Sequence, residues 1–465
     1  MFCRLSFAIL FLGFTSSSLS AEIPCEEPLV VDRPSVWIDD VPDCEATEEH
    51  CSLFGLEYVC SASIEPSEES TEEPRIPFPW PLPFPPPEPP VSDPFCKNGT
   101  QVLCKVEPAV QLTDSQSVDE LKVIAYNIYE LRYAFVQDGQ RERSCRVLFR
   151  TLETTPDVDV IVFNEVFMGG CFADSGKDLD LRELLRYHGF IYYTATVGEA
   201  DCQFQVAPNV ENGGVIVASR WPILYEEETI FEHFVDIDGM FFCKGVMYAK
   251  IEKTVNEESR LYHVFGTHMQ AYRGEANDET RVEQAKEIYE FMNTFDIPEN
   301  ESVIYAGDFN ADAKANAQNA IDVMEAMHAT VPRLIGDYDY TFDRINNDLR
   351  LENDSYVSFL DYVVYSNEHL LPDEETATLE VLRVRDDWFD MCEQSPRRRH
   401  VYPNSEECMQ TISVGDLSDH YAVRGILNYP KIIPPAPVDT GSLTTMNTVL
   451  TLALILLVQV VVGLR

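Results

Sequence analysis

Residues 302–310 read SVIYAGDFN, an apolar run that ends in Asp308, Phe309 and Asn310. A run of this length between polar residues is typical of a buried β-strand. Because successive side chains of a strand point to opposite faces, Asp308 and Asn310 are expected on the same face. The stretch therefore predicts a central strand whose carboxyl end is suited to bind a phosphoryl oxygen and an attacking water together.

Four other stretches repeat this pattern of a predicted strand that ends in a polar group. They are Tyr126-Asn127-Ile128, Asn164-Glu165-Val166, Gly266-Thr267-His268 and Ser418-Asp419-His420. Carboxylate oxygens are the ligands that a hard cation such as Mg²⁺ prefers, and Glu165 follows an apolar run that would place its carboxylate at a strand end. Carboxylates, amides and histidines are together the groups needed to cleave a phosphate ester. The five stretches therefore predict a metal-dependent phosphodiesterase.

Two histidines at predicted strand ends supply groups for proton transfer. His268 and His420 lie beside the polar residues described above, and Asp419 directly precedes His420. Imidazole exchanges protons near neutral pH, so this pair is suited to act as acid and base across one phosphorus. Asp361 is suited to accept a ring N–H and to fix the tautomer of a histidine. A simple strand cap is the alternative role for Asp361.

Residues 116–430 alternate apolar and amphipathic segments, as expected of one catalytic region. The expected strands are 121–128, 158–166, 214–219, 245–252, 261–268, 302–308, 358–366, 381–384 and 421–428. The expected helices are 142–154, 179–187, 280–294 and 317–327. The second of these ends at His188-Gly189, and the third begins after Asn277-Asp278. This mixture predicts an α/β fold in which sheets pack on each other and are covered by helices.

The charge of the chain limits the class of substrate. The formal net charge is −45. An enzyme that acts on nucleic acid normally presents a cationic face to the phosphate backbone, so this charge disfavours a nucleic-acid substrate. Residues 397–399, Arg-Arg-Arg, are the only dense basic cluster, and we interpret them as a solvated loop beside acidic residues.

The N-terminus and the cysteines predict entry into the secretory pathway. Residues 1–20 have a basic residue, an apolar run and a small-residue stretch, as in a signal peptide. Of the thirteen cysteines, Cys3 leaves with this peptide, and the even number that remains is typical of disulfide pairing in an oxidising compartment. Asn98, Asn300 and Asn353 begin glycosylation triplets.

Composition divides the remaining parts of the chain. Residues 21–73 are acidic and rich in cysteine, residues 74–94 form a Pro-rich linker that favours an extended spacer, and residues 95–115 are a Cys-containing connector. Residues 431–448 are a linker with an expected anchor attachment site, and residues 449–465 are largely a short apolar run. A membrane span needs about 20 apolar residues, so we favour the signal for a glycosylphosphatidylinositol (GPI) anchor. These features predict a location at the extracellular face of the cell membrane.

The order Asn, Glu, His, Asp-x-Asn, Leu-Asp-Tyr and Ser-Asp-His resembles the endonuclease/exonuclease/phosphatase superfamily. Six stretches within about residues 121–427 are similar to the secreted, bacterial-type neutral sphingomyelinases of that superfamily. They are LKVIAYNIY (121–129), NEVF (164–167), NGGV (212–215), SRWPI (219–223), GTH (266–268) and LSDHY (417–421). The resemblance implies a four-layer sandwich of two mixed β-sheets flanked by helices, and hydrolysis of sphingomyelin to ceramide and phosphocholine.

The resemblance also implies a divalent cation, usually Mg²⁺, with Mn²⁺ or Co²⁺ as alternatives. Glu165 would be its principal ligand, with Asn127 and Asp419 near the same centre. The catalytic roles implied by the family pattern follow the order of the reaction. His420, oriented by Asp361, would take a proton from water, Asp308 and Asn310 would position water and phosphate, and His268 would stabilise the phosphoryl oxygens or aid the leaving alkoxide.

Two departures from the bacterial pattern concern metal and disulfide sites. The relatives place an Asn soon after the metal-binding Glu, at an edge metal site, where this chain has Met168-Gly169-Gly170. Glu199 and Asp201 are the groups that remain for that site. The relatives also carry a disulfide around the central histidine segment, which Cys243 precedes here, whereas the next cysteine after that segment is Cys392.

Trp388 and Phe389 lie where family members carry an aromatic hairpin that dips into the bilayer. Adjacent large aromatic residues suit an interfacial contact if their rings are exposed, and burial in the core is the alternative. The implied partner is sphingomyelin in the outer membrane leaflet, a zwitterionic lipid that is compatible with the net charge.

Two other functions remain as alternatives. The first is another enzyme of the superfamily, either a nuclease or a phosphoinositide phosphatase, although both prefer polyanionic substrates. The second is a surface-anchored interaction protein without catalysis. A scaffold would not need the full set of polar site residues, which argues against the second alternative. The set consists of Asn127, Glu165, His268, Asp308, Asn310, Asp419 and His420.

Overall fold

The computed structural model describes residues 35–38, 56–63, 100–106, 117–131, 139–167, 170–174, 177–199, 212–235, 241–350, 356–392 and 411–431. The expected signal peptide, Pro-rich linker, anchor signal and basic cluster at 397–399 lie outside these residues, as do Asn98 and Asn353. Among the described residues, no helix is long and apolar enough to cross a membrane.

One large sheet has seven strands and carries the first two site motifs. Its order is β15-β19-β22-β4-β5-β9-β8. The strands are β15 (Arg333–Ile335), β19 (Thr378–Leu382), β22 (Ala422–Asn428), β4 (Glu120–Glu130), β5 (Val160–Val166), β9 (Ile216–Ser219) and β8 (Tyr192–Tyr193). The central neighbours β4 and β5 are parallel, so their carboxyl ends meet at the same edge of the sheet.

The second large sheet has six strands in the order β10-β11-β12-β13-β18-β14. They are β10 (Ile223–Ile230), β11 (Gly245–Val255), β12 (Glu258–His268), β13 (Ser302–Asp308), β18 (Asp361–Ser366) and β14 (Ala329–Thr330). Here β12 and β13 form the parallel pair, while β18 runs antiparallel to β13. The edge strand β10 has three successive glutamates, of which Glu226 and Glu227 are exposed and Glu228 is partly buried.

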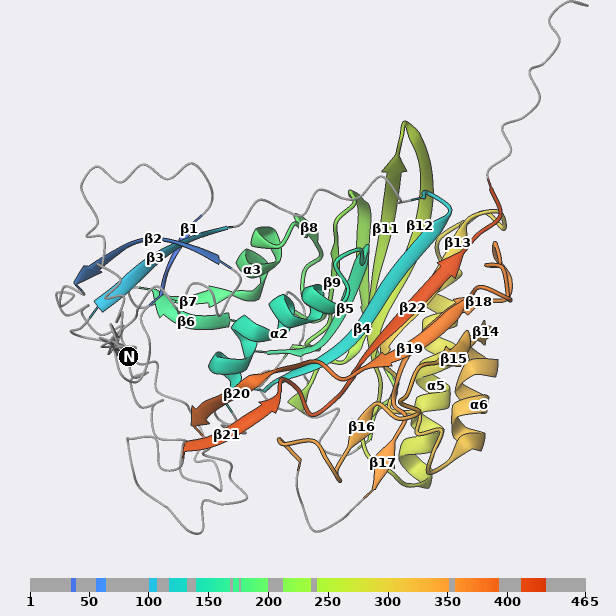
Figure 1. Cartoon of the computed structure of the whole chain (residues 1–465). Coiled ribbons are helices and arrows are strands. Elements are labelled where there is room, and N and C mark those ends of the chain that lie inside the picture. Colours follow the sequence, from blue (N-terminus) through green and yellow to red (C-terminus); the bar gives the residue numbers. More distant parts are fainter. Residues whose placement is uncertain are drawn as a thin grey trace, which may run out of the picture. The chain divides into compact units, whose positions relative to one another are not determined.

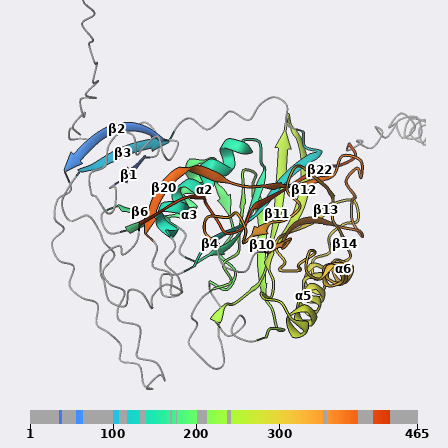
Figure 2. The same cartoon turned by 60° about the horizontal axis from the view of Figure 1, so that its bottom comes forward.

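Helices cover the outer face of each sheet, which gives the expected four-layer sandwich (Figures 1 and 2). Apolar residues of α2 (Gln140–Thr154) and α3 (Leu181–Tyr187) share a core with one face of β4, β5 and β9. Apolar residues of α5 (Glu275–Met292) and α6 (Ala317–Ala326) belong to the core of the six-stranded sheet. The predicted α/β fold of two packed mixed sheets is confirmed.

The two sheets approach each other closely where glycine replaces a larger residue. A Cβ atom added to Gly266 of β12 would lie 2.9 Å from Val162 Cγ1 of β5 and 3.0 Å from Val217 Cγ2 of β9. These separations are too short for a real side chain, so glycine lets the valines of one sheet fill the space above the other. The central part of the core therefore fixes the distance between the sheets.

Most predicted elements are present, with differences at their ends. The expected strand 358–366 is two elements, β17 (Val357–Ser358) and β18, and α5 begins at Glu275 rather than after Asn277-Asp278. The stop at His188-Gly189 is confirmed, since α3 ends at Tyr187 and Gly189 has a φ of 85°. The strand β10 was not predicted, because its exposed glutamates break the apolar pattern.

Several short strands lie outside the two large sheets. A three-stranded sheet contains β1 (Ser35–Ile38), β3 (Thr100–Val106) and β2 (Leu56–Ser63). Three hairpin-like pairs are formed by β6 (Gly170–Asp174) with β7 (Lys177–Asp180), β16 (Phe342–Asp343) with β17, and β20 (Arg385–Cys392) with β21 (Thr411–Asp416).

Candidate active site

The strand register of the two sheets brings the predicted site residues together. Asn127 of β4 pairs with Asn164, which precedes Glu165 on the parallel strand β5. In the other sheet, His268 of β12 pairs with Asp308 of β13, and Asp308 pairs in turn with Asp361 at the start of β18. Because the parallel strands present their carboxyl ends at one edge, residues distant in sequence share one site.

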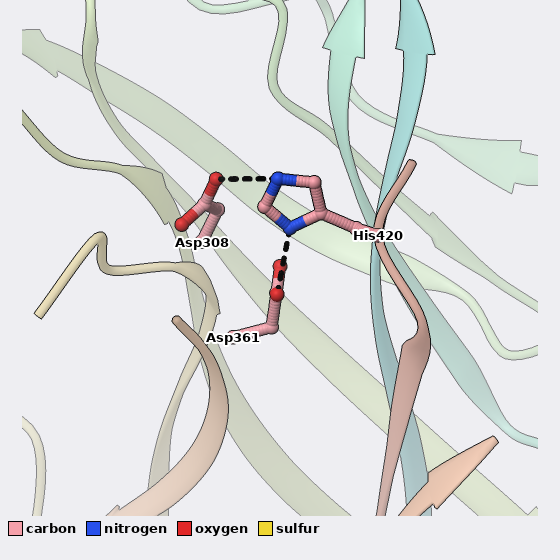
Figure 3. A group of neighbouring side chains, drawn as sticks. All are labelled: Asp308, Asp361 and His420. Atoms are coloured by element: carbon pink, nitrogen blue, oxygen red, sulfur yellow. Dashed lines mark hydrogen bonds and ion pairs between the residues drawn. The ribbon is translucent and has the colours of Figure 1, made fainter. Parts of the chain in front are cut away.

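His420 and Asp361 form a buried hydrogen-bonded pair (Figure 3). His420 Nδ1 lies 2.8 Å from Asp361 Oδ2, and both side chains are buried. This contact fixes the ring so that Nε2 points toward Asp308, with Nε2 4.0 Å from Asp308 Oδ2. Burial lowers the pKa of His420, but the Asp361 carboxylate outweighs it and raises that pKa to about 10. The arrangement is that of a histidine whose tautomer is set by a carboxylate.

Asp308 is the centre of contacts from three directions. Its Oδ2 accepts a hydrogen bond from Asn127 Nδ2 at 3.1 Å and lies 3.6 Å from His268 Nε2. Its Oδ1 accepts the backbone N–H of Asn310 at 2.9 Å. Burial, followed by the charge of Asp361, raises the pKa of Asp308 to about 7. Asp308 therefore joins the His420 side of the site to the Asn127 side.

Glu165 occupies a strained backbone position at the end of β5. Its φ is 59°, a value that non-glycine residues rarely adopt and that costs about 1–3 kcal/mol. Glu165 Oε1 accepts a hydrogen bond from Asn127 Nδ2 at 3.0 Å, whereas Oε2 is buried and has no hydrogen-bond partner. Burial and the Asp419 carboxylate raise the Glu165 pKa. A buried carboxylate without a cationic partner is costly, so this position fits a divalent cation.

A second arrangement of ligand atoms in the site also fits a metal ion. One oxygen each of Asp308 and Asp361 and a ring nitrogen of His420 lie within 4.8 Å of one another. An ion bound through Asp361 Oδ2 and His420 Nδ1 would have to break their hydrogen bond. Glu165 Oε2 has no competing contact of this kind, so Glu165 is the better anchor for a cation.

Asp419 is held by an arginine that the sequence did not indicate. Arg350 Nε and Nη2 donate to Asp419 Oδ2 at 2.8 and 2.5 Å. The Arg350 guanidinium also lies 4.4 Å from the centre of the Tyr129 ring. Burial raises the pKa of Asp419, but the Arg350 charge outweighs it and keeps that pKa below its ordinary value. One Asp419 oxygen is therefore engaged by Arg350, which leaves Oδ1 as the oxygen available to other groups.

Two further residues support the site and were absent from the predicted set. Asn164 Nδ2 donates to the carbonyl of Thr267 at 2.8 Å, and Asn164 Oδ1 accepts the backbone N–H of Asp308 at 3.0 Å. The amide thus ties the end of β5 to the ends of β12 and β13. Lys244 Nζ donates to the carbonyl of Met269, and burial together with the Lys244 charge holds the His268 pKa well below its ordinary value. Asn164 was within a quoted motif, but Lys244 had no sequence pattern that would indicate it.

Asn310 lies beside the site but not on the strand expected for it. Strand β13 ends at Asp308, and Asn310 has a φ of 53°, so the alternation of strand side chains does not extend to it. Its Nδ2 donates to the carbonyl of Met269 at 3.2 Å. The turn nevertheless keeps Asn310 next to Asp308 and to the loop that follows His268.

The remaining predicted residues differ in their exposure. Trp388 is 65% exposed, but Phe389 is only 9% exposed because its ring lies under Arg146, 4.4 Å from the guanidinium carbon. Phe389 therefore matches the alternative of burial in the core, and Trp388 alone of the two is accessible for a membrane contact. Asn300 is exposed, as a glycosylation acceptor must be.

The described residues include Glu199 and Cys243, which belong to the two departures from the bacterial pattern. Glu199 Oε2 lies 2.8 Å from Arg182 Nη2, so this carboxylate already has a cationic partner, and Asp201 lies outside the described residues. Cys243, which precedes the central histidine segment, is disulfide-bonded.

The chain is similar in sequence to bacterial sphingomyelinases C and in fold to a solved beta toxin. No family model matches the chain. Sphingomyelinase C from Bacillus cereus is 31% identical over 273 residues, which are 55% of this chain and 77% of that protein. Sphingomyelinase C 2 from Leptospira interrogans is 28% identical over 270 residues, or 54% of this chain and 40% of that protein. A solved beta toxin variant from Staphylococcus aureus with bound magnesium ions is 25% identical, has a TM-score of 0.53, and covers 67% of this chain and 100% of its own.

Proposed function

Because the chain belongs to the sphingomyelinase C family, we propose that it is a metal-dependent phosphodiesterase that hydrolyses sphingomyelin to ceramide and phosphocholine. One observation carries this proposal. The pair formed by His420 and Asp361 lies next to Asp308, and Asp308 is linked through Asn127 to the buried Glu165 carboxylate. A proton-transfer group and a cation-binding group are therefore joined through Asp308 and Asn127, as action on one phosphorus requires.

We propose a role for each side chain. Nε2 of His420 takes a proton from the attacking water, whose oxygen forms a bond to phosphorus as the bond from phosphorus to the ceramide oxygen breaks, and the ceramide oxygen takes up a proton from solvent. Asp308 orients this water, and Asn310 binds a phosphoryl oxygen. The neutral His268 ring donates a hydrogen bond to the developing charge on the phosphoryl or leaving oxygen.

Mg²⁺ is the cation that we propose, with Glu165 as its main ligand. When bound, it supplies positive charge that stabilises the phosphoryl and leaving oxygens and brings the His420 pKa toward the range of a base. Asn127 donates to Glu165 in this structure and so orients the carboxylate. Asp419 offers Oδ1 near the same centre, since Oδ2 is bound by Arg350. Mn²⁺ and Co²⁺ are alternatives to Mg²⁺.

The test is phosphocholine release from sphingomyelin by the purified protein. We expect activity with Mg²⁺, loss of activity with a chelator, and recovery when excess Mg²⁺ is added. The variant His420→Ala should be inactive, whereas Lys286→Ala, which removes an exposed ion pair on α5, should match the parent. Equal release in all samples would contradict the proposal. Cleavage of DNA, or phosphate release from a phosphoinositide, without cleavage of sphingomyelin would support the alternative enzyme classes.

We also propose that the mature protein is secreted and held at the extracellular face of the cell membrane by a GPI anchor, close to sphingomyelin of the outer leaflet. The sequence of residues 1–20 and 449–465 supports this location. The exposed ring of Trp388 supports a peripheral contact with the lipid surface. Treatment of expressing cells with a phospholipase that cleaves GPI anchors should release the protein, whereas a membrane-spanning tail would resist it.

A further inference from the structure

A strained and exposed tyrosine follows the site histidine His268. Tyr272 has a φ of 70° and is 67% exposed. A bulky residue in this conformation is strained and persists where the surroundings hold it. Glycine or asparagine would adopt the same backbone with less strain.

The backbone around Tyr272 is fixed from both sides. Arg281, which is only 2% exposed, donates from Nη1 to the carbonyls of Gln270 and Tyr272 at 2.8 and 2.9 Å. On the other side, Arg273 Nη2 donates to Asp312 and Ser358 at 2.8 and 3.0 Å. The exposed ring of Tyr272 therefore projects from a rigid loop.

A series of rings and guanidinium groups connects this loop to the catalytic histidine. The Phe342 ring lies 5.1 Å from the His420 ring and 6.2 Å from the Tyr356 ring. The guanidinium carbons of Arg273 and Arg344 lie 4.2 and 5.0 Å from the centre of the Tyr356 ring. Arg273, the neighbour of Tyr272, is thus joined to the His420 ring by a short series of contacts.

The same series reaches a second exposed apolar residue. Ile345, which follows Arg344, is 48% exposed. Asp348 in the same loop accepts a hydrogen bond from Arg385 at 2.8 Å, and the Arg385 guanidinium lies 5.5 Å from the exposed Trp388 ring. Tyr272 and Ile345 are therefore continuous with the lipid contact proposed for Trp388.

From this arrangement we propose that Tyr272, Arg273, Arg344 and Ile345 form a docking rim for a zwitterionic phospholipid bilayer. Tyrosine and arginine are suited to the headgroup level of a membrane, where the ring or the alkyl stem is apolar and the end is polar. The arginines contact lipid phosphates, while Tyr272 and Ile345 enter the layer below. The net charge of −45 opposes anionic bilayers, which makes a choline lipid surface the matching occupant.

This inference rests on the proposed function for its biological meaning, but its test does not require hydrolysis. Binding of the full chain to vesicles of phosphatidylcholine alone can be measured by co-sedimentation. The variant Tyr272→Asn removes the ring and keeps a residue that tolerates positive φ, and a thermal melt checks that it folds like the parent. Ile345→Ser removes the second apolar side chain. Ile321→Ser is the matched control, because Ile321 is 49% exposed on α6, outside the rim.

We expect vesicle partitioning to fall about fivefold for each rim variant and to be unchanged for the control. Hydrolysis of vesicle-embedded sphingomyelin should fall in parallel, whereas hydrolysis of a water-soluble phosphocholine diester should change less than twofold. Unchanged partitioning of both rim variants would overturn the rim. Loss of self-association in place of vesicle binding would also overturn it and would indicate a contact between copies of the chain. Absence of phosphocholine release by the parent would overturn the proposed function while leaving the partitioning result interpretable.

Discussion

The His420 side and the Glu165 side of the site differ in how their buried charges are compensated. His420 and Asp361 compensate each other through a contact of 2.8 Å. Glu165 makes no ion pair among the described residues, and its Oε2 has no hydrogen-bond partner. The first pair has an opposite charge in direct contact, although Asp361 Oδ1 is also buried without a hydrogen-bond partner, whereas the Glu165 carboxylate has no such ion pair among those residues. This difference indicates that proton transfer is built into the fold and that a bound cation must complete the Glu165 side.

The largest effect that separates the two sides is expected from His420→Ala. Removing the base should lower kcat by about 10²- to 10⁴-fold because no other imidazole occupies its place. Mg²⁺ affinity should stay close to that of the parent, which isothermal calorimetry can measure. A large loss of Mg²⁺ binding would show that His420 is a ligand and would remove the distinction between the two sides.

Glu165→Gln should have the complementary effect. The amide preserves the shape of the side chain but removes the negative charge, so Mg²⁺ affinity should fall at least tenfold and activity should fall with it. Because the variant also removes an uncompensated buried charge, its thermal stability without metal should rise or stay equal. Thermal melts with and without Mg²⁺ check both expectations. A parent protein that gains no stability from Mg²⁺ would contradict a cation at Glu165.

Asp361→Asn tests how the first side is held together. An amide can present a donor to Nδ1 and so favour the wrong tautomer, and kcat should fall about 10²- to 10⁴-fold while Mg²⁺ affinity is retained. The pH dependence of kcat shows whether Asp361 acts through His420. Loss of the carboxylate lowers the His420 pKa, so the acidic limb of the rate profile should shift to lower pH. An unshifted limb would show that Asp361 does not act through His420.

Arg350→Lys is expected to have a smaller effect. A lysine keeps the charge near Asp419 but cannot reproduce both hydrogen bonds of the guanidinium, so we expect kcat to fall about tenfold with little change in KM. Arg333→Lys is a matched control on an exposed strand. Equal activity of the two variants would exclude a positioning role for Arg350.

Much of this architecture could be predicted from apolar runs and their polar ends. The runs that form β4, β5, β12 and β13 are recognisable because they are largely apolar and each carries a polar residue near its carboxyl end. These residues are Asn127, Glu165, His268 and Asp308. The convergence of those residues needed two parallel pairs in two different sheets, a feature that the family resemblance supplied and local patterns could not.

The residues that were missed or misplaced depend on contacts between distant segments. Arg350 meets Asp419 across 69 positions of the chain, and no periodicity marks such a pair. Phe389 was paired with Trp388 as an exposed dipeptide, but a strand points neighbours to opposite sides, and Arg146 of α2 covers one of them. The position of Asn310 was argued from strand alternation, which ends with β13.

The acidic edge strand β10 has a consequence for how copies of the protein behave when crowded. An open strand edge offers unpaired N–H and C=O groups to any other edge that comes near. The exposed Glu226 and Glu227 make two such edges repel each other, so β10 resists joining a neighbouring molecule into a continuous sheet. Molecules confined to a surface would therefore remain separate, and each would keep its own site accessible.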